Sequence, residues 1–180
     1  MALVYSNNST AVGLFHKATG AARDKLVHSL LLQIGNISAN DLPVEPKHDR
    51  GAAEHSYVLP PNVGVSFSHT AEQMLVAVAL NGRVGVDQEK VDSINNWKEV
   101  AQTWYAPEEF RWLENLSPQN FEYEACRIWT RKEAVAKYLG QGVGWIEKRV
   151  SVLTSNIGPI QILDLNMPAG FAATLAIAQT

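Results

Sequence analysis

Two acidic side chains on one short segment are the first candidates for chemistry. Asp87 and Glu89 lie two positions apart in a valine-rich stretch, RVGVDQE, that we expect to be a β-strand. Successive side chains leave a strand on opposite faces, so these two carboxylates share a face. They repel each other unless a cation or a basic group lies between them. The pair therefore belongs either to a solvent-exposed edge strand or to a cation site.

The segment WTRKEAVAK, which begins at Trp129, is a second candidate and is expected to be helical. Trp129, Glu133 and Lys137 are four residues apart and form one stripe of that helix, with Lys132 at its edge. One interpretation is a structural helix with a Glu-to-Lys ion pair, worth about 0.2–0.5 kcal/mol. The other is a functional helix, in which an acid binds a cation and a lysine meets a phosphate.

If Glu133 meets Asp87 and Glu89 in space, the three carboxylates form a hard-oxygen site of the kind that magnesium prefers. Such a site leaves coordination positions for water and for the phosphate oxygens of a substrate. Sequence spacing alone does not show that the three side chains converge.

A serine–histidine pair, Ser68 and His69, lies between two expected strands in the segment SFSHT. The hydroxyl and the imidazole could donate hydrogen bonds to a phosphate. The alternative is an ordinary turn with an exposed histidine. A serine-hydrolase nucleophile is disfavoured, because neither Ser66 nor Ser68 lies in a G-x-S-x-G elbow.

The elements that must position these residues follow from the apolar pattern. We expect, in chain order, a strand at 2–5, a helix at 21–34 that stops at Gly35, a loop at 36–62, and strands at 63–69 and 73–80. The dipeptide Asn81-Gly82 favours a two-residue hairpin turn. It predicts that the strand of Asp87 pairs with 73–80, which gives three consecutive antiparallel strands.

Helices dominate the next part of the chain. Pro107 suits the first position of a helix that we expect to reach about Leu116. Ser117-Pro118 then begins a helix that continues to about Leu139 and ends at Gly140. After a glycine-rich loop at 141–148, we expect strands near 149–154, 159–164 and 171–179.

This order of elements predicts an α+β protein. The Asn81-Gly82 turn is its natural division. We therefore expect an N-terminal half at 1–82 and a C-terminal half at 83–180 that carries the candidate metal ligands, both within one compact unit.

The composition excludes several classes of protein. A formal net charge of -3 and a pI near 5.9 over 180 residues argue against a general nucleic-acid-binding surface. The single cysteine, Cys126, cannot form an intrachain disulfide. The most apolar stretches, 74–80 and 171–178, are too short to span a bilayer, and the N-terminus lacks the apolar run of a signal peptide. We expect a cytoplasmic protein with no membrane or nucleic-acid partner.

Taken in order, the motifs FSHT, VGVDQE and WTRKEAVAK resemble those of the 4'-phosphopantetheinyl transferase superfamily, in particular its surfactin-synthetase (Sfp) type. In that family a serine–histidine motif precedes a G-[IV]-D-x-E strand, and a W-x-x-K-E-x-x-x-K helix follows. The resemblance covers roughly residues 63 to 145 well and the first 60 residues only loosely. It implies a transfer of phosphopantetheine from coenzyme A to a serine of an apo carrier protein, with release of 3',5'-ADP.

The resemblance also implies roles for the three motifs. Asp87, Glu89 and Glu133 would be ligands of Mg²⁺, and Glu133, or a water that it holds, would be the general base. Lys137 would stabilise the transferred phosphoryl group or the departing nucleotide, with help from Lys132. Coenzyme A would be the co-substrate, and the overall activity would be of the holo-[acyl-carrier-protein] synthase type.

Coenzyme A contacts follow the resemblance less closely. His69, with Ser68, would contact the 3'-phosphate. A basic motif that commonly precedes the serine–histidine pair in the family is replaced here by GAAEHSY, in which His55 is the remaining candidate. Lys17 and Arg23 are further candidates for the missing positive charge. A lost charge-assisted hydrogen bond typically costs about 1.5–3 kcal/mol, so coenzyme A would be bound less tightly.

The architecture implied by the resemblance is a monomeric pseudo-dimer of two similar α+β halves with coenzyme A at their interface. The partner would be an acyl or peptidyl carrier protein, whose acidic helix could meet Arg127, Arg131, Lys148 or Arg149. The sequence does not separate fatty acid, polyketide and peptide pathways.

Two other functions remain open at this point. A non-catalytic relative that binds a carrier protein or coenzyme A would account for the missing basic residues. A magnesium-dependent phosphohydrolase could use the same three carboxylates, although the order of the motifs favours the transferase.

Overall fold

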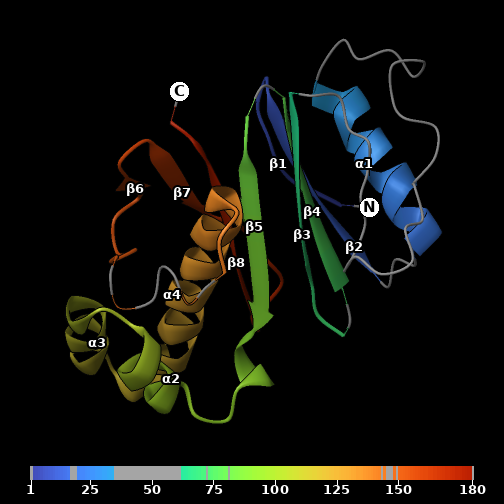
Figure 1. The fold of residues 1–180 in the computed structure, drawn as a ribbon. Helices are drawn as coiled ribbons and strands as arrows, with labels where there is room; N and C mark the ends of the chain where they lie inside the picture. Colours follow the sequence, from blue (N-terminus) through green and yellow to red (C-terminus); the bar gives the residue numbers. More distant parts are fainter. Residues whose placement is uncertain are drawn as a thin grey trace.

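The computed structural model describes residues 2–16, 20–34, 62–71, 73–80, 82–142, 144, 148 and 150–179. Within these ranges the chain forms two four-stranded antiparallel sheets and the helices that cover them (Figure 1). The strands of one sheet all precede Asn81, and those of the other all follow Gly82.

The first sheet has the strand order β1-β2-β4-β3. Its strands are β1 (Ala2–Ser6), β2 (Thr10–His16), β3 (Val63–His69) and β4 (Gln73–Leu80). Helix α1 (Gly20–Ile34) covers one face of this sheet. Its buried stripe packs on β2 and β4 through Val27, Leu30, Leu31 and Ile34.

The second sheet has the strand order β5-β8-β7-β6. Its strands are β5 (Val84–Lys90), β6 (Asn156–Ile157), β7 (Ile160–Asp164) and β8 (Phe171–Ala178). The 3-10 turn η2 (Val91–Ser93) follows β5. The described α-helices of this half are α2 (Trp97–Trp104), α3 (Pro107–Glu114) and α4 (Pro118–Leu139). Helix α4 lies along β5 and β8, and α2 and α3 pack on α4.

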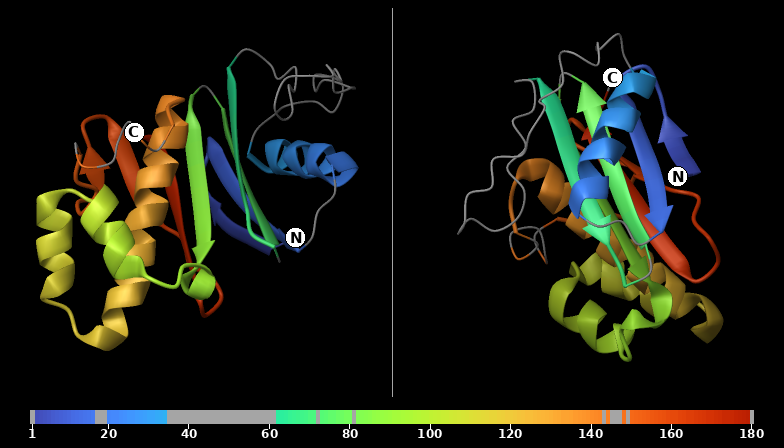
Figure 2. Two further views of the ribbon diagram at one scale, coloured as in Figure 1. Left: turned by 60° about the horizontal axis from the view of Figure 1, so that its bottom comes forward. Right: turned by 90° about the vertical axis from the view of Figure 1, so that its right-hand side faces the viewer.

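The two sheets face each other across a shared core. It contains alternate residues of β2, β4, β5 and β8, namely Val12, Leu14, Leu75, Ala77, Ala79, Val84, Val86, Ala173, Leu175 and Ile177. Because strand side chains alternate, the opposite faces of these strands contact α1 or α4. The layers are therefore helix, sheet, sheet and helix, and the left view of Figure 2 shows them in the order α4, second sheet, first sheet and α1.

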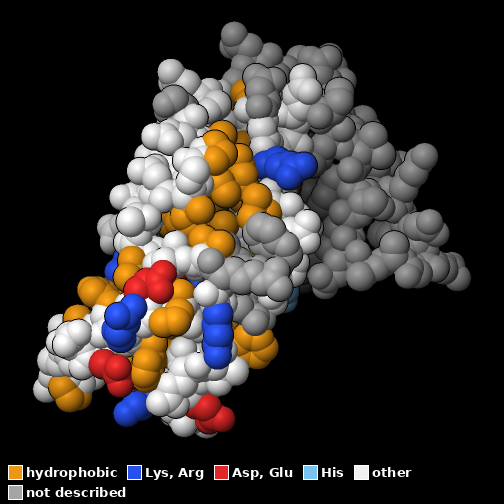
Figure 3. Space-filling view, turned by 60° about the vertical axis from the view of Figure 1, so that its left-hand side comes forward, with side chains coloured by type: hydrophobic (Ala, Val, Ile, Leu, Met, Phe, Trp, Pro, Cys, Tyr) orange, Lys and Arg blue, Asp and Glu red, His pale blue; other side chains and the backbone are white. Residues whose placement is uncertain are grey.

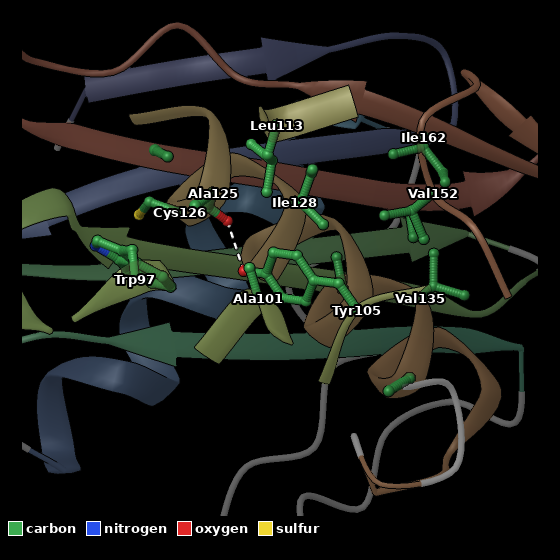
Figure 4. Close-up of a cluster of buried hydrophobic side chains, with 14 of the residues drawn as sticks. Trp97, Ala101, Tyr105, Leu113, Ala125, Cys126, Ile128, Val135, Val152 and Ile162 are labelled. Carbon is green, nitrogen blue, oxygen red and sulfur yellow. Dashed lines mark hydrogen bonds between the residues drawn. The ribbon is translucent and has the colours of Figure 1, made fainter. Parts of the chain in front are cut away.

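A second core lies between α4, the two short helices and the second sheet (Figure 4). The Tyr105 side chain is buried there, and its hydroxyl donates to the carbonyl oxygen of Ala125 at 2.6 Å. Trp129 is half-buried against this core. Its position gives it a packing role.

The edge strands β3 and β5 meet through side chains instead of a backbone ladder. Ser66 and Ser68 face β5, and their hydroxyl oxygens accept the backbone N–H groups of Val86 at 3.0 Å and Gln88 at 3.1 Å. Both serines are buried, so the two hydroxyls replace the water that an edge strand would otherwise bind. We call this contact between β3 and β5 the seam.

Gly85 allows α4 to approach β5 closely. A Cβ atom at this position would overlap the carbonyl oxygen of Ala134 and would lie 2.6 Å from the backbone nitrogen of Tyr138. Gly85 shares its face of β5 with Asp87 and Glu89. The absence of a side chain therefore brings the backbone of α4 down onto the face that carries the acidic residues.

Several sequence predictions are confirmed. The α+β architecture with two similar halves is present, as are the helix at 21–34 and the strands at 63–69, 73–80 and 171–179, within one or two residues. Helix α4 begins after Ser117 and ends at Gly140, which adopts a left-handed conformation with φ of 69°. Within the described ranges, no helix has the length and apolarity that a membrane span requires.

Other predictions are wrong. The hairpin at Asn81-Gly82 does not form, because β4 pairs with β2 and β3 whereas β5 pairs with β8. Turn chemistry is local, and it does not determine which sheet the next strand joins. Residues 150–154, the described part of the strand expected near 149–154, have no strand structure.

Strand β2 and helix α2 were not expected from the sequence. Strand β2, TAVGLFH, is buried on both faces, so the alternation that marks a half-buried strand is absent. The loop expected at 36–62 lies outside the described residues except for Asn62.

We predict that Gly85→Ala destabilises the fold by about 2–3 kcal/mol, because its methyl group forces α4 away from β5. Urea unfolding measures the change. Gly142→Ala is the matched control, since a Cβ atom there meets nothing within 4 Å, and it should change stability by less than about 0.5 kcal/mol. Equal unfolding free energies for the two variants would contradict a close approach at Gly85.

Candidate active site

Asp87 lies at the centre of the candidate site, between β5 and α4. Its Oδ1 atom accepts hydrogen bonds from Lys137 Nζ at 2.8 Å and from the Ser68 hydroxyl at 3.0 Å. Its Oδ2 atom is buried and has no hydrogen-bond partner among the described residues. Burial raises the pKa of Asp87, and the neighbouring Lys137 ammonium opposes that rise.

Glu89 and Glu133 lie near enough to Asp87 to affect its chemistry and each other's. Burial raises the pKa of Glu89 to about 7, and the charges of Asp87 and Glu133 add to this effect. Burial also raises the pKa of Glu133, with a further contribution from Asp87. The charge of Asp87 thus acts on Glu89 and on Glu133, which lies 46 residues further along the sequence.

These carboxylates provide suitable chemistry for a magnesium ion without forming a finished coordination shell. Among the residues that the structure describes, no group of three or more His, Cys, Asp or Glu side chains is arranged to hold a metal ion. The donors are nevertheless hard oxygens that repel one another, and Asp87 Oδ2 is buried without a partner. A divalent cation would satisfy that atom and offset the repulsion, so the donor set fits the ion.

Lys137 links the acidic residues to the seam. Besides Asp87, its ammonium group donates to the carbonyl oxygens of Phe67 at 3.2 Å and Val86 at 3.1 Å. These two carbonyls belong to β3 and β5, so one side chain of α4 contacts both edge strands. The Lys137 side chain is 30% exposed, so part of it faces solvent although its ammonium group is bonded to three acceptors.

The serine–histidine pair divides between two roles. The Ser68 hydroxyl is buried in the seam, where it donates to Asp87 and accepts from Gln88. His69 is exposed at the end of β3. It lines a cavity of about 200 Å³ with Thr70 and Ala71 of the first half and with Glu89, Lys90 and Ser93 of the second. We call this the seam cavity.

Comparison with known proteins shows a family for the half of the chain that contains the acidic residues. The model of the 4'-phosphopantetheinyl transferase superfamily matches residues 83–176, just over half of the chain. The chain belongs to this superfamily. The matched region includes β5, α4 and β8, and thus Asp87, Glu89, Glu133 and Lys137, whereas Ser68 and His69 precede it.

Individual relatives carry the same family name. The chain is 31% identical over 80 residues to the 4'-phosphopantetheinyl transferase AcpT of Salmonella typhi, a match that covers 44% of this chain and 41% of the relative. It is 28% identical over 89 residues to HetI of Nostoc sp., which covers 49% and 38% respectively. It is 26% identical over 129 residues to gsp of Aneurinibacillus migulanus, which covers 68% and 51%. The matched regions thus span about half or less of each relative's own length.

In this phosphopantetheinyl transferase superfamily member, Lys132 lies in the core and not at the coenzyme site where we expected it. Its side chain is 0% exposed and forms an ion pair with the equally buried Glu109 at 2.8 Å. It also donates to the carbonyl oxygen of Val150 at 2.9 Å. A side chain without exposed surface does not contact a phosphate, so we correct its role from a coenzyme contact to a structural one.

Glu109, which the sequence analysis did not single out, completes this buried network. Its two carboxylate oxygens accept the backbone N–H groups of Ala106 and Val152, each at 2.7 Å. It therefore joins the start of α3, the middle of α4 and the segment before β6. The only sequence indication was an acid in the first turn of a helix, which is common at exposed positions.

The remaining coenzyme candidates are not tested by the structure. His55 and Lys17 lie outside the described residues. Arg23 belongs to α1, but its side chain is also outside the described part. Their roles remain predictions.

Two of the four basic residues that we expected to meet a carrier protein form ion pairs within the chain. Arg131 and Arg127 both bind Asp164, at 2.6 Å and 2.9 Å. Lys148 is exposed, and Arg149 lies outside the described residues. On the face in Figure 3, basic and acidic side chains are mixed over the helical end of the molecule.

We predict that Lys132→Met destabilises the fold by about 3–5 kcal/mol, because it leaves the Glu109 carboxylate buried without its counter-ion. Adding Glu109→Gln should recover part of this loss. Urea unfolding measures both variants, with the exposed Lys98→Met as the control. Unchanged unfolding of Lys132→Met together with weaker coenzyme A binding would restore the ligand role.

We predict that the metal-free fold loses stability as pH rises from about 5 to 8. Glu89 has a higher pKa in the folded chain, about 7, than its ordinary 4.5, so the folded state holds this proton more tightly. Its contribution is present below about pH 4.5 and is lost as pH rises through 7; Asp87 and Glu133 shift in the same direction.

Urea unfolding at several pH values tests this dependence. Glu89→Gln should flatten it, and Mg²⁺ should stabilise the wild type more at pH 8 than at pH 5, since the ion binds the ionised carboxylates. Glu122→Gln, an exposed glutamate on α4, is the control. A slope that persists unchanged in Glu89→Gln would rule out this residue as its source.

Proposed function

We propose that this chain transfers the 4'-phosphopantetheine arm of coenzyme A to a serine of an apo carrier protein and releases 3',5'-ADP. The observation that carries the proposal is the contact of Asp87 Oδ1 with the ammonium group of Lys137 at 2.8 Å and with the Ser68 hydroxyl at 3.0 Å. The charges of Asp87 and Glu133, which raise the pKa of Glu89, support a shared acidic site. Membership of the superfamily supports it. The order of the three motifs and the similarity to gsp favour the surfactin-synthetase type.

Phosphoryl transfer requires positioning and charge neutralisation more than covalent help from the protein. Asp87, Glu89 and Glu133 would hold Mg²⁺. A bound magnesium ion would neutralise the pyrophosphate of coenzyme A and stabilise the leaving oxygen. The proposal includes no nucleophile from this chain, because the attacking hydroxyl belongs to the carrier serine.

In this scheme one residue accepts the proton of the carrier serine, and another stabilises the charge on the phosphoryl group. The serine oxygen forms a bond to the β-phosphorus of coenzyme A as the bond from that phosphorus to the 3',5'-ADP oxygen breaks. Glu133 takes the serine proton, and burial favours this because it raises the Glu133 pKa toward that of a useful base. Lys137, with an exposed part of its side chain, stabilises the charge that develops on the phosphoryl oxygens.

The seam cavity is where the coenzyme would approach both halves. His69 and Lys90 provide nitrogen donors on its two walls, and Glu89 connects it to the acidic residues. Exposed Lys148 would favour an acidic carrier surface. A chain that binds coenzyme A or a carrier without transfer is the second candidate, because no completed metal-ligand group is present in the described residues.

Incubation with coenzyme A, Mg²⁺ and several apo carrier proteins, followed by mass spectrometry of the carriers, tests the activity. We expect the phosphopantetheine adduct with the wild type. Glu133→Gln should slow transfer by at least about 100-fold, because the general base is lost, while the fold is retained. Glu122→Gln, the same substitution at an exposed position of the same helix, should transfer normally.

The outcomes separate the candidate functions. Full activity in Glu133→Gln would remove this residue from the mechanism. Coenzyme A binding by calorimetry without an adduct on any carrier would favour the non-catalytic relative. Neither binding nor transfer would reject the proposed function.

A further inference from the structure

Gln88 is a buried polar residue that follows two apolar residues on the same face of β5. It follows Val84 and Val86 on the side of β5 that faces the first sheet, and it is 1% exposed. An amide in such a position costs stability unless its donors and acceptor are all bonded. An apolar side chain would serve packing alone, so the contacts of the amide indicate a further role.

The Gln88 side chain bonds to the chain around the β3–β4 turn. Its Nε2 atom donates to the carbonyl oxygens of Ser68 and Gln73, each at 3.1 Å. Because both acceptors are carbonyls, the orientation of the amide is determined. Its Oε1 atom then accepts from Gln73 Nε2 at 3.1 Å. One side chain of β5 thus binds the last part of β3 and the first residue of β4.

The same turn supplies one wall of the seam cavity. Thr70 donates its backbone N–H to Gln73 O at 2.8 Å, the oxygen that Gln88 also binds, and His69 and Ala71 flank Thr70. Glu89, the neighbour of Gln88 in the chain, lies on the opposite wall. The Gln88 amide therefore connects the two walls across the seam.

We propose that Gln88 is a positioning residue that holds the His69 wall of the seam cavity at a set distance from the Asp87–Glu89 strand. Gln73 completes this amide pair. The effect on coenzyme A rests on the proposed function, whereas the effect on the turn does not. Gln88 touches no reacting atom in this scheme, so its loss acts on coenzyme binding more than on the chemical step.

Gln88→Met tests the role, because methionine keeps the length of the side chain and removes all three side-chain hydrogen bonds. Hydrogen exchange of the Thr70 amide in the ligand-free chain should accelerate about tenfold or more. In the transfer assay, KM for coenzyme A should rise about tenfold while kcat changes by less than about threefold.

Two further variants make the test specific. Val84→Ala, a truncation of a buried residue on the same face of β5, should lower overall stability without a selective effect on Thr70 exchange or KM. Gln73→Met removes the bond from Gln73 to Gln88 Oε1 and keeps the acceptors of Gln88 Nε2, so it should act in the same direction as Gln88→Met but more weakly. It also keeps the test valid if Gln88→Met does not fold.

The results test separately whether Gln88 holds the β3–β4 turn and whether this affects coenzyme A binding. Wild-type Thr70 exchange in Gln88→Met and Gln73→Met would overturn the link between Gln88 and the turn. Faster exchange with unchanged KM in an active protein would overturn the positioning role. If the wild type neither binds coenzyme A nor transfers, the proposed function fails, and the exchange measurement still decides whether Gln88 holds the turn.

Discussion

The ammonium group of Lys137 is the point at which the two halves of this protein and its candidate site depend on one another. It has three donors, and the structure gives them three acceptors: Phe67 O on β3, Val86 O on β5 and Asp87 Oδ1. The backbone N–H groups of Val86 and Gln88 on β5 donate in turn to the Ser66 and Ser68 hydroxyls of β3. The seam thus satisfies two strand edges with side chains, where a continuous sheet would use backbone alone.

Lys137 and Asp87 belong both to the seam and to the acidic site, so a change in either residue affects the packing of the two halves and the candidate site together. Burial raises the pKa of Asp87, Glu89 and Glu133, and the charges of neighbouring acids add to this effect for Glu89 and Glu133. A fold selected for stability alone has no need of three such groups. One of them, Glu89, lines a cavity that both halves share, which is consistent with a site for a cation and a phosphorylated ligand.

The two lysines of the W-x-x-K-E-x-x-x-K helix illustrate how one motif divides between core and site. Lys132 and Lys137 are five positions apart, which places them about 140° apart around the helix axis. One side chain consequently enters the core and pairs with Glu109, while the other turns to the seam and pairs with Asp87. Both are ion pairs, yet only the second retains exposed surface from which to act on a ligand.

Elements whose residues have strong local preferences, and the residue types of the candidate site, could be predicted from the sequence. The apolar stripe of α1, the caps Ser117 and Gly140 of α4, and the shared face of Asp87 and Glu89 all follow from short-range geometry. Strand β2 lacks alternation because both of its faces are buried, so its pattern becomes interpretable only when both packing partners are known.

The sequence did not predict which sheet β5 joins, which lysine is buried or where the Ser68 hydroxyl points. Each of these depends on groups that are distant in the sequence: β8 for the strand, Glu109 for Lys132, and Asp87 for the serine. Local turn chemistry at Asn81-Gly82 was outweighed by the pairing of β5 with β8 and by the side-chain hydrogen bonds of the seam. Long-range pairing and burial have no short-range pattern, and for that reason the arrangement of the site around its predicted residues came from the fold.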